Sequence, residues 1–552
     1  MKDYEEIVAF LDQWGCFQKA VFFLLCASII PNGFGAFNLV FLTDVPDHHC
    51  FVPDLNFSEE WRKSIIPKTV LNGKQELSRC SRYRLDVVQN LSDRGFIPGR
   101  DINLTDLEEE RCVDGWSYST DVYLSTVVTE FDLVCSDQWA QPFTTSVFFI
   151  GVLVGSFFSG QLSDRYGRKP ILFATMAAQT IFTFAQVFST SWTMFVILLF
   201  FNGLGQISNF VAALVLGAEV LTGNVRILYS SMGTCLGFAV GYILLSVVAY
   251  FLRDWKSLLM ALSLPCLAYI PLWWLLPESP RWLLSRGRVK EAEAVIRKAA
   301  RWNKVQAPTV IFETYSSLQV KETKSDKEQS SMLGLFRNSR IRITTLVLCL
   351  VHFTMTTGYY SLSFNTAQLH ADPYMSCFIA AAVEIPAYVS SWIALRFLPR
   401  RLSVSGTLIL GSLPLFILLL VPEDLFGVSL ALEMVGKYAF TTGASLMFAY
   451  TTELYPTSLR NTATGTTTTV SRAGSCISPF LLSLGGYFSY LPYVTIGSLG
   501  AVTAFVALLL PETFKQPLPE TLQQMHERQT TKCPCIQKAE ASEPAVLPDS
   551  PL

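Results

Sequence analysis

The hydrophobic residues of this chain gather in runs of about twenty, separated by polar stretches. A helix needs about 20 apolar residues to cross the ~30 Å core of a bilayer, so each run has the length of a membrane span. A large soluble core would instead show shorter amphipathic helices with charged outer faces. We therefore predict an all-α membrane protein with twelve transmembrane helices, at 20–42, 142–162, 170–190, 194–218, 228–252, 257–276, 343–366, 374–397, 402–421, 425–451, 462–487 and 491–510.

The composition supports a membrane protein and excludes several other classes. Hydrophobic residues make up 51% of the 552 residues and charged residues only 16%, whereas soluble domains carry roughly 25% charged residues. A nucleic-acid binder, a disordered scaffold and an ordinary cytosolic enzyme are therefore excluded. No nucleophile–base pair or metal-ligand cluster stands out in the sequence, so we expect neither an enzyme nor a bound metal or other cofactor.

The distribution of charge predicts the orientation in the membrane. Segment 43–141 holds 18 acidic and 10 basic residues, whereas 278–342 holds 14 basic and 7 acidic residues. Lys and Arg accumulate on the cytoplasmic side, so 43–141 is predicted outside and 277–342 inside, with both termini in the cytosol of a plasma-membrane protein. The predicted order is N-terminus (1–19), first helix (20–42), outer loop (43–141), helices two to six (142–276), inner loop (277–342), helices seven to twelve (343–510) and a disordered cytoplasmic tail (511–552).

The outer segment carries the chemistry of an extracellular loop. It contains three glycosylation sequons, which begin at Asn56, Asn90 and Asn103. It also contains an even set of cysteines, which are able to form two disulfides in an oxidising compartment, and the spacing leaves all three pairings open. The four cysteines are Cys50, Cys80, Cys112 and Cys135.

The two halves of the chain repeat each other at one offset of 234 residues. Glu219 and Arg226 after the fourth span correspond to Glu453 and Arg460 after the tenth, and Pro277-Glu278 corresponds to Pro511-Glu512. A common offset at equivalent span ends predicts a six-plus-six repeat, with the substrate path between the halves near mid-membrane. Transport would then proceed by one half rocking against the other.

The loop between the second and third spans reads Gly160-Gln161-Leu162-Ser163-Asp164-Arg165-Tyr166-Gly167-Arg168-Lys169. It resembles the signature loop of the major facilitator superfamily, and 398–401 is a reduced second copy. We expect charged residues at the cytoplasmic ends to form gating clusters that hold one conformation and break in the other. The gating candidates are Asp164, Arg168, Glu219, Arg226, Glu453 and Arg460.

Further motifs resemble the organic ion transporter family, and the resemblance extends to about residue 525. They are the long outer loop, Pro277-Glu278-Ser279-Pro280-Arg281-Trp282-Leu283 and Glu453-Leu454-Tyr455-Pro456-Thr457. Residues 3–4, 27–34, 121–126 and 205–209 resemble the carnitine and zwitterion branch of that family. The resemblance implies import of a small quaternary ammonium carboxylate such as carnitine by alternating access, with Na⁺ as the coupling ion.

Two other functions remain open. One is a Na⁺-independent organic cation carrier or an ergothioneine-type zwitterion carrier. The other is a relative without transport activity that acts as a membrane receptor or adaptor. Costly polar groups at membrane depth argue against the latter, because such groups are rare in spans without a function.

Two ionisable residues at membrane depth are the first candidates for substrate contacts. Arg472 is able to grip a carboxylate through two parallel hydrogen bonds, and the resembling carriers of anions and carnitine have Arg there. Its alternative role is a structural ion pair with Glu433 or Glu384. Glu384 would attract a cationic head, pair with Lys437 or relay a proton.

Neutral amides and aromatic rings complete the predicted site. Gln206 and Asn209 are three residues apart on one helix face, and with Asn32 they offer the oxygen atoms that Na⁺ prefers. Asn209 is also a substrate candidate, and the alternative for all three is hydrogen bonding between helices. Tyr359 and Phe448 would present ring faces to a quaternary ammonium, or would simply pack.

Some positions depart from the resembling branch. Residues 221–224 lack the usual Lys and no other phosphate-binding loop is present, so ATP-driven transport is not expected. Phe210 and Asn365 replace an expected Tyr and Asp, and Glu433 is an unexpected acid. In the tail, 533–535 offers two cysteines for acylation and 550–552 weakly resembles a ligand of PDZ-type scaffolds.

Overall fold

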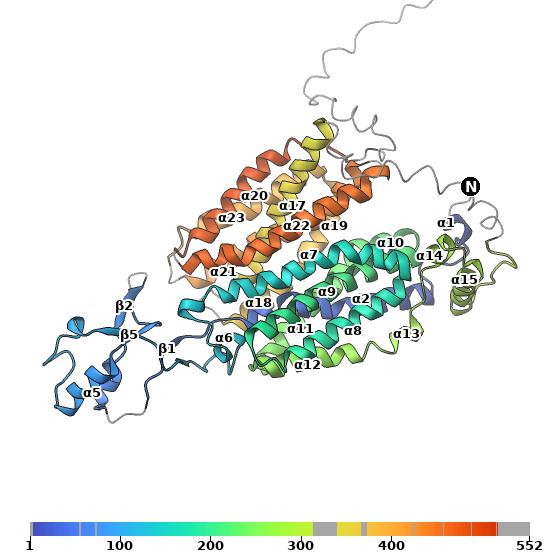
Figure 1. Cartoon of the computed structure of the whole chain (residues 1–552). Helices are drawn as coiled ribbons and strands as arrows, with labels where there is room; N and C mark the ends of the chain where they lie inside the picture. The colour runs from blue at the N-terminus through green and yellow to red at the C-terminus, as the bar shows by residue number, and fades with distance from the viewer. Residues whose placement is uncertain are drawn as a thin grey trace, which may run out of the picture.

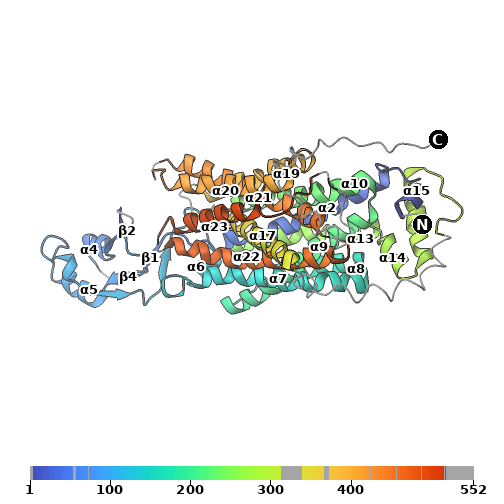
Figure 2. The same cartoon turned by 90° about the horizontal axis from the view of Figure 1, so that it is seen from above.

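The structure is a computed structural model, and it is mostly helical. It describes residues 4–53, 57–71, 74–312, 339–365, 372–422, 425–455, 457–486, 488–514 and 516. Figure 1 shows an elongated bundle of long helices, with a small domain of strands and short helices at one end and the short helices α14 (Pro280–Ser285) and α15 (Val289–Asn303) at the other. Figure 2 shows the same order along the bundle from above.

The first half of the bundle is built from the helices before residue 277. They are α2 (Cys16–Phe37) with its continuation α3 (Leu39–Leu42), α7 (Ala140–Tyr166), α8 (Arg168–Gln186), α9 (Trp192–Val220), α10 (Gly223–Leu228), which leads through η3 (Tyr229–Gly233) into α11 (Thr234–Phe251), then α12 (Trp255–Leu267) and α13 (Leu272–Leu275).

The second half follows residue 338. Its helices are α17 (Ser339–Asn365), α18 (Pro373–Ala382), α19 (Glu384–Phe397), α20 (Arg400–Leu418), α21 (Phe426–Leu454), α22 (Thr457–Ser483), the short η4 (Leu484–Gly486) and α23 (Leu491–Ala507).

Helix pairing repeats between the halves. In the first half α2 packs against α11, α7 against α9, α8 against α9 and α8 against α12. In the second half α17 packs against α22, α19 against α21, α20 against α21 and α20 against α23. These are equivalent pairs in a six-plus-six order, so the sequence repeat corresponds to a repeat of packing. The halves meet where α7 contacts α22 and α11 contacts α18.

Not every predicted span is apolar by composition. Among the described residues, seven segments are long and apolar enough to cross a membrane: Cys16–Leu42, Cys135–Tyr166, Trp192–Val220, Gly223–Phe251, Ile341–Asn365, Pro373–Phe397 and Arg400–Leu418. Helices α21 and α22 do not qualify, although each has the length to cross. α21 carries Glu433 and Lys437 and α22 is rich in threonine, so polar side chains lower their hydropathy.

Small residues allow the closest helix contact in the first half. A Cβ atom added to Gly33 of α2 would lie 2.3 Å from the Phe238 carbonyl oxygen, and one added to Gly241 of α11 would lie 2.1 Å from the Ile30 carbonyl oxygen. Any larger residue at either position would push the two backbones apart. The contact fixes α2, which carries Asn32, against α11.

Hydrogen bonds join the two halves toward the end that carries the outer loop. The Ser146 hydroxyl on α7 donates to the Cys476 carbonyl on α22 at 2.8 Å, and Ser246 on α11 lies 3.1 Å from the Cys377 sulfur on α18. At the same end the Tyr374 hydroxyl donates to the Val122 carbonyl at 3.0 Å. The seam between the halves is therefore held closed on the loop side.

The prediction of an all-α chain is wrong for the outer loop, which contains three two-stranded antiparallel sheets. β1 (His48–Cys50) pairs with β6 (Trp116–Tyr118), β2 (Lys68–Leu71) with β3 (Lys74–Leu77) and β4 (Ser81–Tyr83) with β5 (Glu109–Arg111). Short helices α4 (Glu59–Ser64), α5 (Leu85–Asp93) and α6 (Val127–Glu130) and the turns η1 (Leu104–Asp106) and η2 (Cys135–Asp137) complete it. Apolar packing around the fully buried Trp61 provides a core separate from that of the bundle.

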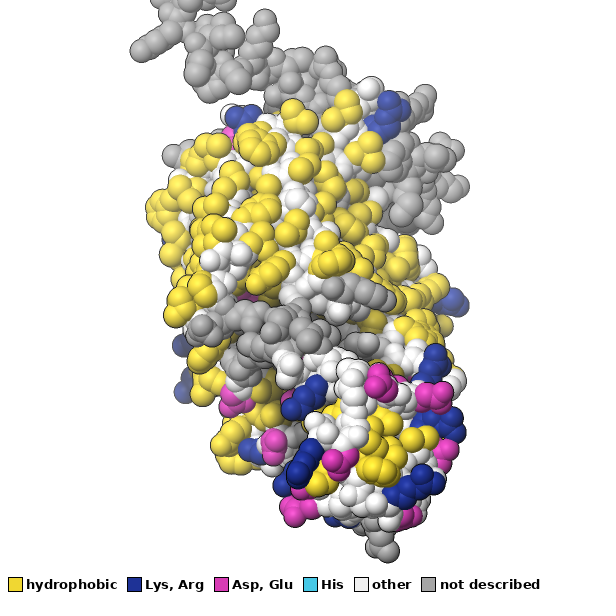
Figure 3. All heavy atoms as spheres, turned by 90° about the vertical axis from the view of Figure 1, so that its left-hand side faces the viewer, with side chains coloured by type: hydrophobic (Ala, Val, Ile, Leu, Met, Phe, Trp, Pro, Cys, Tyr) yellow, Lys and Arg dark blue, Asp and Glu magenta, His cyan; other side chains and the backbone are white. Residues whose placement is uncertain are grey.

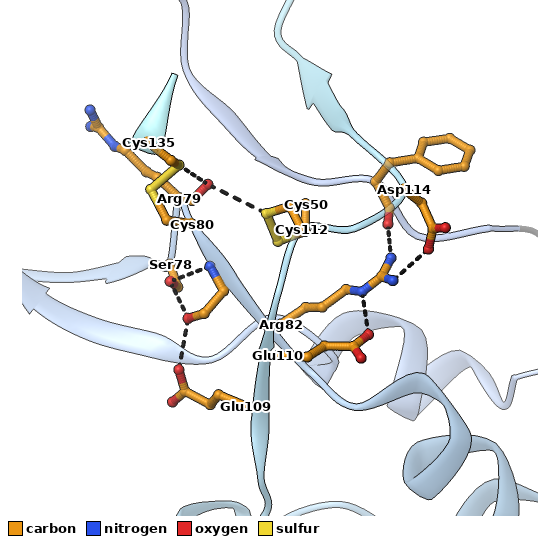
Figure 4. The surroundings of a disulfide bond; sticks show 12 residues. Cys50, Ser78, Arg79, Cys80, Arg82, Glu109, Glu110, Cys112, Asp114 and Cys135 are labelled. Carbon is orange, nitrogen blue, oxygen red and sulfur yellow. Dashed lines mark hydrogen bonds and ion pairs between the residues drawn. A yellow bond between two sulfur atoms is a disulfide. The ribbon is translucent and has the colours of Figure 1, made fainter. Parts of the chain in front are cut away.

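Disulfides and one buried arginine hold the loop together (Figure 4). The structure joins Cys50 to Cys112 and Cys80 to Cys135, which selects one of the three pairings that the sequence leaves open. Arg82, only 2% exposed, pairs with Glu110 at 2.8 Å and Asp114 at 2.5 Å. Figure 3 shows charged side chains gathered on the loop, and hydrophobic side chains over the helices behind it.

The end of the bundle opposite the outer loop has a small core of its own. α15 buries Ala292, Ile296 and Ala299, which lie on one helix face. This face shares an apolar cluster with Trp282 of α14 and with Tyr4 of α1 (Tyr4–Ile7). The N-terminal segment is thereby fixed to the chain that follows the first half.

We predict that removing the disulfide between Cys50 and Cys112 will destabilise the outer loop. The bond closes a separation of 62 residues, for which chain entropy alone gives about 4 kcal/mol. The double variant Cys50→Ser/Cys112→Ser should show a much smaller fraction of protein at the cell surface, measured by surface biotinylation. Cys16→Ser, at an exposed free cysteine, is the control; equal surface fractions in both variants would contradict the prediction.

Candidate functional site

A buried ion pair lies where the two halves meet. Lys437 of α21 and Glu384, the first residue of α19, are both fully buried, and the Lys437 Nζ lies 3.3 Å from the Glu384 Oε1. The Tyr359 hydroxyl donates to the same Oε1 at 2.7 Å, and the Tyr388 hydroxyl donates to Oε2 at 3.3 Å. A carboxylate taken out of water needs such partners to offset the lost hydration. Glu384 therefore has the partners of an ionised side chain.

Aromatic rings from both halves surround the Lys437 ammonium. The Nζ lies 4.5 Å from the ring centroid of Tyr242 on α11, and 5.6 Å from those of Phe37 on α2 and Tyr359 on α17. Phe37 and Tyr242 are stacked, with centroids 4.0 Å apart. Such an arrangement attracts a cation by the quadrupoles of the rings. In this state the cage holds the chain's own lysine.

Phe448 does not belong to this cage. Its side chain is 51% exposed, and its ring lies 6.0 Å from that of His352 on α17. It was predicted beside Tyr359, because the family resemblance favours both residues. Phe448 lies eleven residues, about three helical turns, beyond Lys437 on α21, so the structure places the two predicted aromatics at different depths.

Arg472 has no acidic partner in the described part of the chain. The side chain is half-buried on α22, and its Nε is buried without a hydrogen-bond partner. The guanidinium interacts with the Tyr360 hydroxyl of α17. The alternative ion pairs do not form, because Glu384 pairs with Lys437 and Glu433 accepts a hydrogen bond from Asn365. The positive charge of Arg472 is thus left for another negative group.

The three amides predicted to form an ion site lie together in the first half. The Asn32 Nδ2 donates to the Asn209 Oδ1 at 3.0 Å, and the Gln206 Nε2 donates to the Asn32 carbonyl at 2.6 Å. Gln179 of α8 donates to the Pro31 carbonyl at 3.2 Å, which anchors the same turn of α2. All four side chains are buried.

Two oxygens of this amide cluster have no partner. The Asn32 Oδ1 and the Gln206 Oε1 are buried and accept no hydrogen bond from the described residues. Hard cations are bound by carbonyl and carboxamide oxygens, and these two oxygens lie in a cluster that carries no competing positive charge. The donor set therefore fits a monovalent hard cation such as Na⁺.

At the end of the first half that lies opposite the outer loop, Arg168 is the centre of the predicted gating cluster. Its guanidinium lies 2.9 Å from Glu219 and 2.5 Å from Asp164. The Glu278 carboxylate accepts from the backbone N–H groups of Arg168 and Lys169 at 3.0 and 3.1 Å. It thereby caps the N-terminus of α8, where a negative charge is stabilised.

Gly167 makes this cap possible. Its φ of +108° lies in the region that favours glycine, and an added Cβ would lie 2.7 Å from the Glu278 carboxylate. The glycine of the signature loop therefore has a specific task, which is to let α7 turn into α8 beside an acidic cap.

The second half repeats the cluster around Glu453, a predicted gating residue, with Arg400 as its basic partner. Glu453 pairs with Arg400 at 3.1 Å, and Glu512 accepts from the backbone N–H groups of Arg400 and Arg401 at 2.8 and 3.1 Å. The Thr513 hydroxyl donates to Glu453 at 2.7 Å.

Two further residues were predicted to take part in gating. The Arg460 side chain lies outside the described residues, and Arg226 lies on α10. Sequence reasoning used Glu278 and Glu512 only as markers of the repeat. Glu278 and Glu512 are related by the same offset of 234 residues as Glu219 and Glu453. This offset is the signal in the sequence that identifies them as the second acid of each cluster.

The sequons lie in the outer loop. Asn90 on α5 and Asn103, which caps η1, are exposed, whereas Asn56 lies outside the described residues. Exposed positions are open to a glycosyl group, and glycosylation at all three stays a prediction.

A surface pocket lies on the loop side of the closed seam between the halves. It is lined by Asp44, Gln141 and Thr145 of the first half and by Phe364, Pro479 and Ser483 of the second half. Asp44 follows the first apolar segment and is half-buried. Loss of hydration raises its pKa from 3.8 to about 6, while a hydrogen bond from the Val45 backbone N–H at 3.0 Å opposes the rise. Asp44 is thus a carboxyl at the outer seam that titrates in mildly acidic solution.

Comparison with known proteins gives a consistent result. Residues 113–525 match the family described as Sugar (and other) transporter. Organic cation/carnitine transporter 2 of Mus musculus is 50% identical over 526 residues, which cover 95% of this chain and 94% of that protein. Solute carrier family 22 member 4 of Mus musculus is 48% identical over 97% of this chain and 96% of that protein, and an Organic cation transporter protein of Drosophila melanogaster is 33% identical over 94% of each.

Solved structures share the fold. A major facilitator superfamily proton:xylose symporter, XylE, bound to 6-bromo-6-deoxy-D-glucose aligns with a TM-score of 0.59 and 15% identity, over 92% of this chain and 99% of that chain. The partially occluded inward open xylose transporter from E. coli aligns with a TM-score of 0.61 and 14% identity, over 91% of this chain and all of that chain.

We predict that Asp44→Asn will raise the thermal stability of the purified protein at pH 7.5 by a few degrees. The pKa of Asp44 is higher in the folded chain, so its stabilisation is complete below about pH 4 and lost as the pH rises through about 6. The melting temperatures of the variant and the native chain should therefore converge near pH 4. The exposed Asp106→Asn is the control, and a difference that does not depend on pH would refute the assignment.

Proposed function

Because the chain belongs to the organic cation/carnitine transporter branch of the major facilitator superfamily, we propose that it imports a small zwitterion with a quaternary ammonium and a carboxylate. Carnitine is the leading candidate. The observation that supports the carboxylate is that Arg472 has no acidic partner among the described residues and that its buried Nε has no hydrogen-bond partner there. An Arg held at membrane depth without an acidic neighbour is costly, and a substrate carboxylate offsets that cost.

In the proposed complex, Arg472 binds the carboxylate through two parallel charge-assisted hydrogen bonds. The ammonium end faces the aromatic cage of Phe37, Tyr242 and Tyr359 and the carboxylate of Glu384. Lys437 occupies that cage in this state. A substrate cation would therefore either bind beside Lys437 or take its place next to Glu384. Charge balance favours this exchange, since one cation replaces another beside the same acid.

Na⁺ is the proposed coupling ion. It would be bound by the oxygens of Asn32, Gln206 and Asn209, which support the proposal because two buried oxygens there have no partner. Asn209 then belongs to the ion site, and only indirectly to the substrate site. Binding of a cation among these amides would fix α2 and α9 relative to each other, and α2 also carries Phe37 of the cage.

The membrane topology completes the proposal. Twelve helices cross the plasma membrane as two sets of six, both termini are cytoplasmic, and the loop between the first two spans is extracellular and glycosylated. Inter-half hydrogen bonds on the loop side support a state closed to the outside. Rocking of one half against the other would open that seam, and the Arg168 and Arg400 clusters would rearrange at the opposite end. A contact of the C-terminal tail with a PDZ-type scaffold lies outside the described residues.

We predict that Arg472→Gln will lower carnitine uptake by roughly 10- to 100-fold, the value of one or two lost charge-assisted hydrogen bonds. Uptake of labelled carnitine, normalised to the amount of protein at the cell surface, is the measurement. Arg396→Gln, at an exposed end of α19, is the matched control. Normal carnitine affinity in Arg472→Gln would defeat the proposed carboxylate site and favour an organic cation carrier.

We predict that Gln206→Leu will raise the Na⁺ concentration needed for half-maximal carnitine uptake, because one oxygen of the ion site is lost. Uptake is measured over a series of Na⁺ concentrations, with N-methylglucamine replacing Na⁺. The control is Gln186→Leu, at a buried amide of α8 that bonds none of the three proposed ligands. Uptake that is unaffected by Na⁺ in the native chain would overturn the coupling and leave an uncoupled carrier.

A further inference from the structure

Among the described residues of the second half, two fully buried acids lie near one fully buried base, so one acid is left without a neutralising partner. Glu384, Glu433 and Lys437 are each 0% exposed. Lys437 forms its ion pair with Glu384 at 3.3 Å. Glu433 lies one helical turn before Lys437 on α21, yet it has no ion pair among the described residues. An isolated buried carboxylate is among the costliest groups in a protein interior.

The surroundings of Glu433 provide little for a negative charge. The Asn365 Nδ2 donates to the Glu433 Oε1 at 2.9 Å, and the same Nδ2 lies 2.5 Å from the Tyr493 hydroxyl of α23. The Glu433 Oε2 is buried and has no partner in the described part of the chain. A single neutral donor does not replace the hydration of a carboxylate.

A metal cation at this position is a poor fit. Asn365 turns its amide nitrogen toward Glu433, so its oxygen is not offered to the same point. The charged group that acts on Glu433 among the described residues is Lys437, which would repel a cation. A proton needs only one oxygen lone pair, and it removes the unpaired charge.

We propose that Glu433 is a proton-binding site of the transport cycle, occupied in this state and emptied when Lys437 exchanges its partner from Glu384 to Glu433. The proton leaves from the Glu433 Oε2 to water, and Lys437 keeps its charge throughout. This inference rests on the proposed function, because a substrate cation beside Glu384 is what releases Lys437. Export of a proton, or an effect of pH on import, would accompany the exchange.

The other titratable groups near this site are few. The titratable neighbours of Glu433 are Lys437 on α21 and Tyr493 on α23. The side chain that faces it from α17 is the neutral Asn365. Glu384 of α19 and Cys377 of α18 act on Lys437 instead. The described helices α20 and α22, which also contact α21, add no charge that acts on Glu433.

The first test needs no substrate. Thermal unfolding of the purified full-length chain is measured from pH 6 to pH 9 for the native protein and Glu433→Gln. The glutamine imitates a protonated acid, so the two melting temperatures should be close at pH 6. The native protein should then fall below the variant as the pH rises, because the folded state loses a bound proton. A constant difference across this range would overturn the proposal.

The second test is uptake of labelled carnitine at the same pH values. The ratio of uptake at pH 6 to uptake at pH 8.5 should differ from one in the native chain and fall to about one in Glu433→Gln. Asp44→Asn, which removes the half-buried carboxyl at the outer seam, should keep the native ratio. A native ratio that persists in Glu433→Gln but is lost in Asp44→Asn would assign the pH effect to the outer seam and overturn the proposal.

A third variant covers a failure of Glu433→Gln to fold. Asn365→Asp places a second carboxyl beside Glu433, and two acids that share a site hold a proton more tightly. The pH at which the native melting temperature declines should therefore shift upward in Asn365→Asp. An unchanged profile would count against a proton at this site. If the native chain took up no carnitine, the proposed substrate would be wrong. The unfolding measurements need no substrate and would still test the proton site at Glu433.

Discussion

The cost of burying charge governs the centre of this molecule. Lys437 and Glu384 are fully buried and neutralise each other across 3.3 Å, and Tyr359 and Tyr388 satisfy the remaining oxygen positions of the carboxylate. Because this pair is satisfied internally, Arg472 and Glu433 have no ionic partner in the part of the chain that the structure describes. The same constraint thus produces a stable junction between the halves and two unbalanced groups, and these two groups are where the proposed cargo and a proposed proton bind.

The two halves use one scaffold for different chemistry. The helix pairs and the Arg–Glu clusters at the end opposite the outer loop repeat, with Arg168–Glu219 in one half and Arg400–Glu453 in the other. At membrane depth the repeat is lost, because the first half has neutral amides around Asn32 and the second half has charges around Lys437. Neutral amide oxygens are suitable ligands for a small hard cation. Charged side chains of both signs are suitable partners for the two ends of a zwitterion. The amides of the proposed ion site are distinct from the charged groups and rings of the proposed substrate site, so the two proposed ligands would bind without competing.

Sequence reasoning predicted what depends on local spacing and on the repeat. The proximity of Asn32, Gln206 and Asn209 and the pairing of Arg168 with acids follow from helix faces and from span ends. It left the choice open where a tertiary contact decides: a pair with Lys437 is one of three roles that the sequence allows for Glu384, and the structure contains that pair. The disulfide pairing, the strands of the outer loop and the place of Phe448 likewise depend on long-range packing. No periodicity within a short segment reveals these features.

The central claim is that the positive charge of Arg472 is reserved for the negative end of a zwitterion. The most direct measurement is an experimental structure of the chain in a lipid nanodisc with carnitine and Na⁺. The account predicts density for the carboxylate within hydrogen-bonding distance of the Arg472 guanidinium, and density for the ammonium beside Tyr359 and Glu384. Carnitine bound with its carboxylate elsewhere, or an acidic side chain paired with Arg472 in the complex, would contradict it.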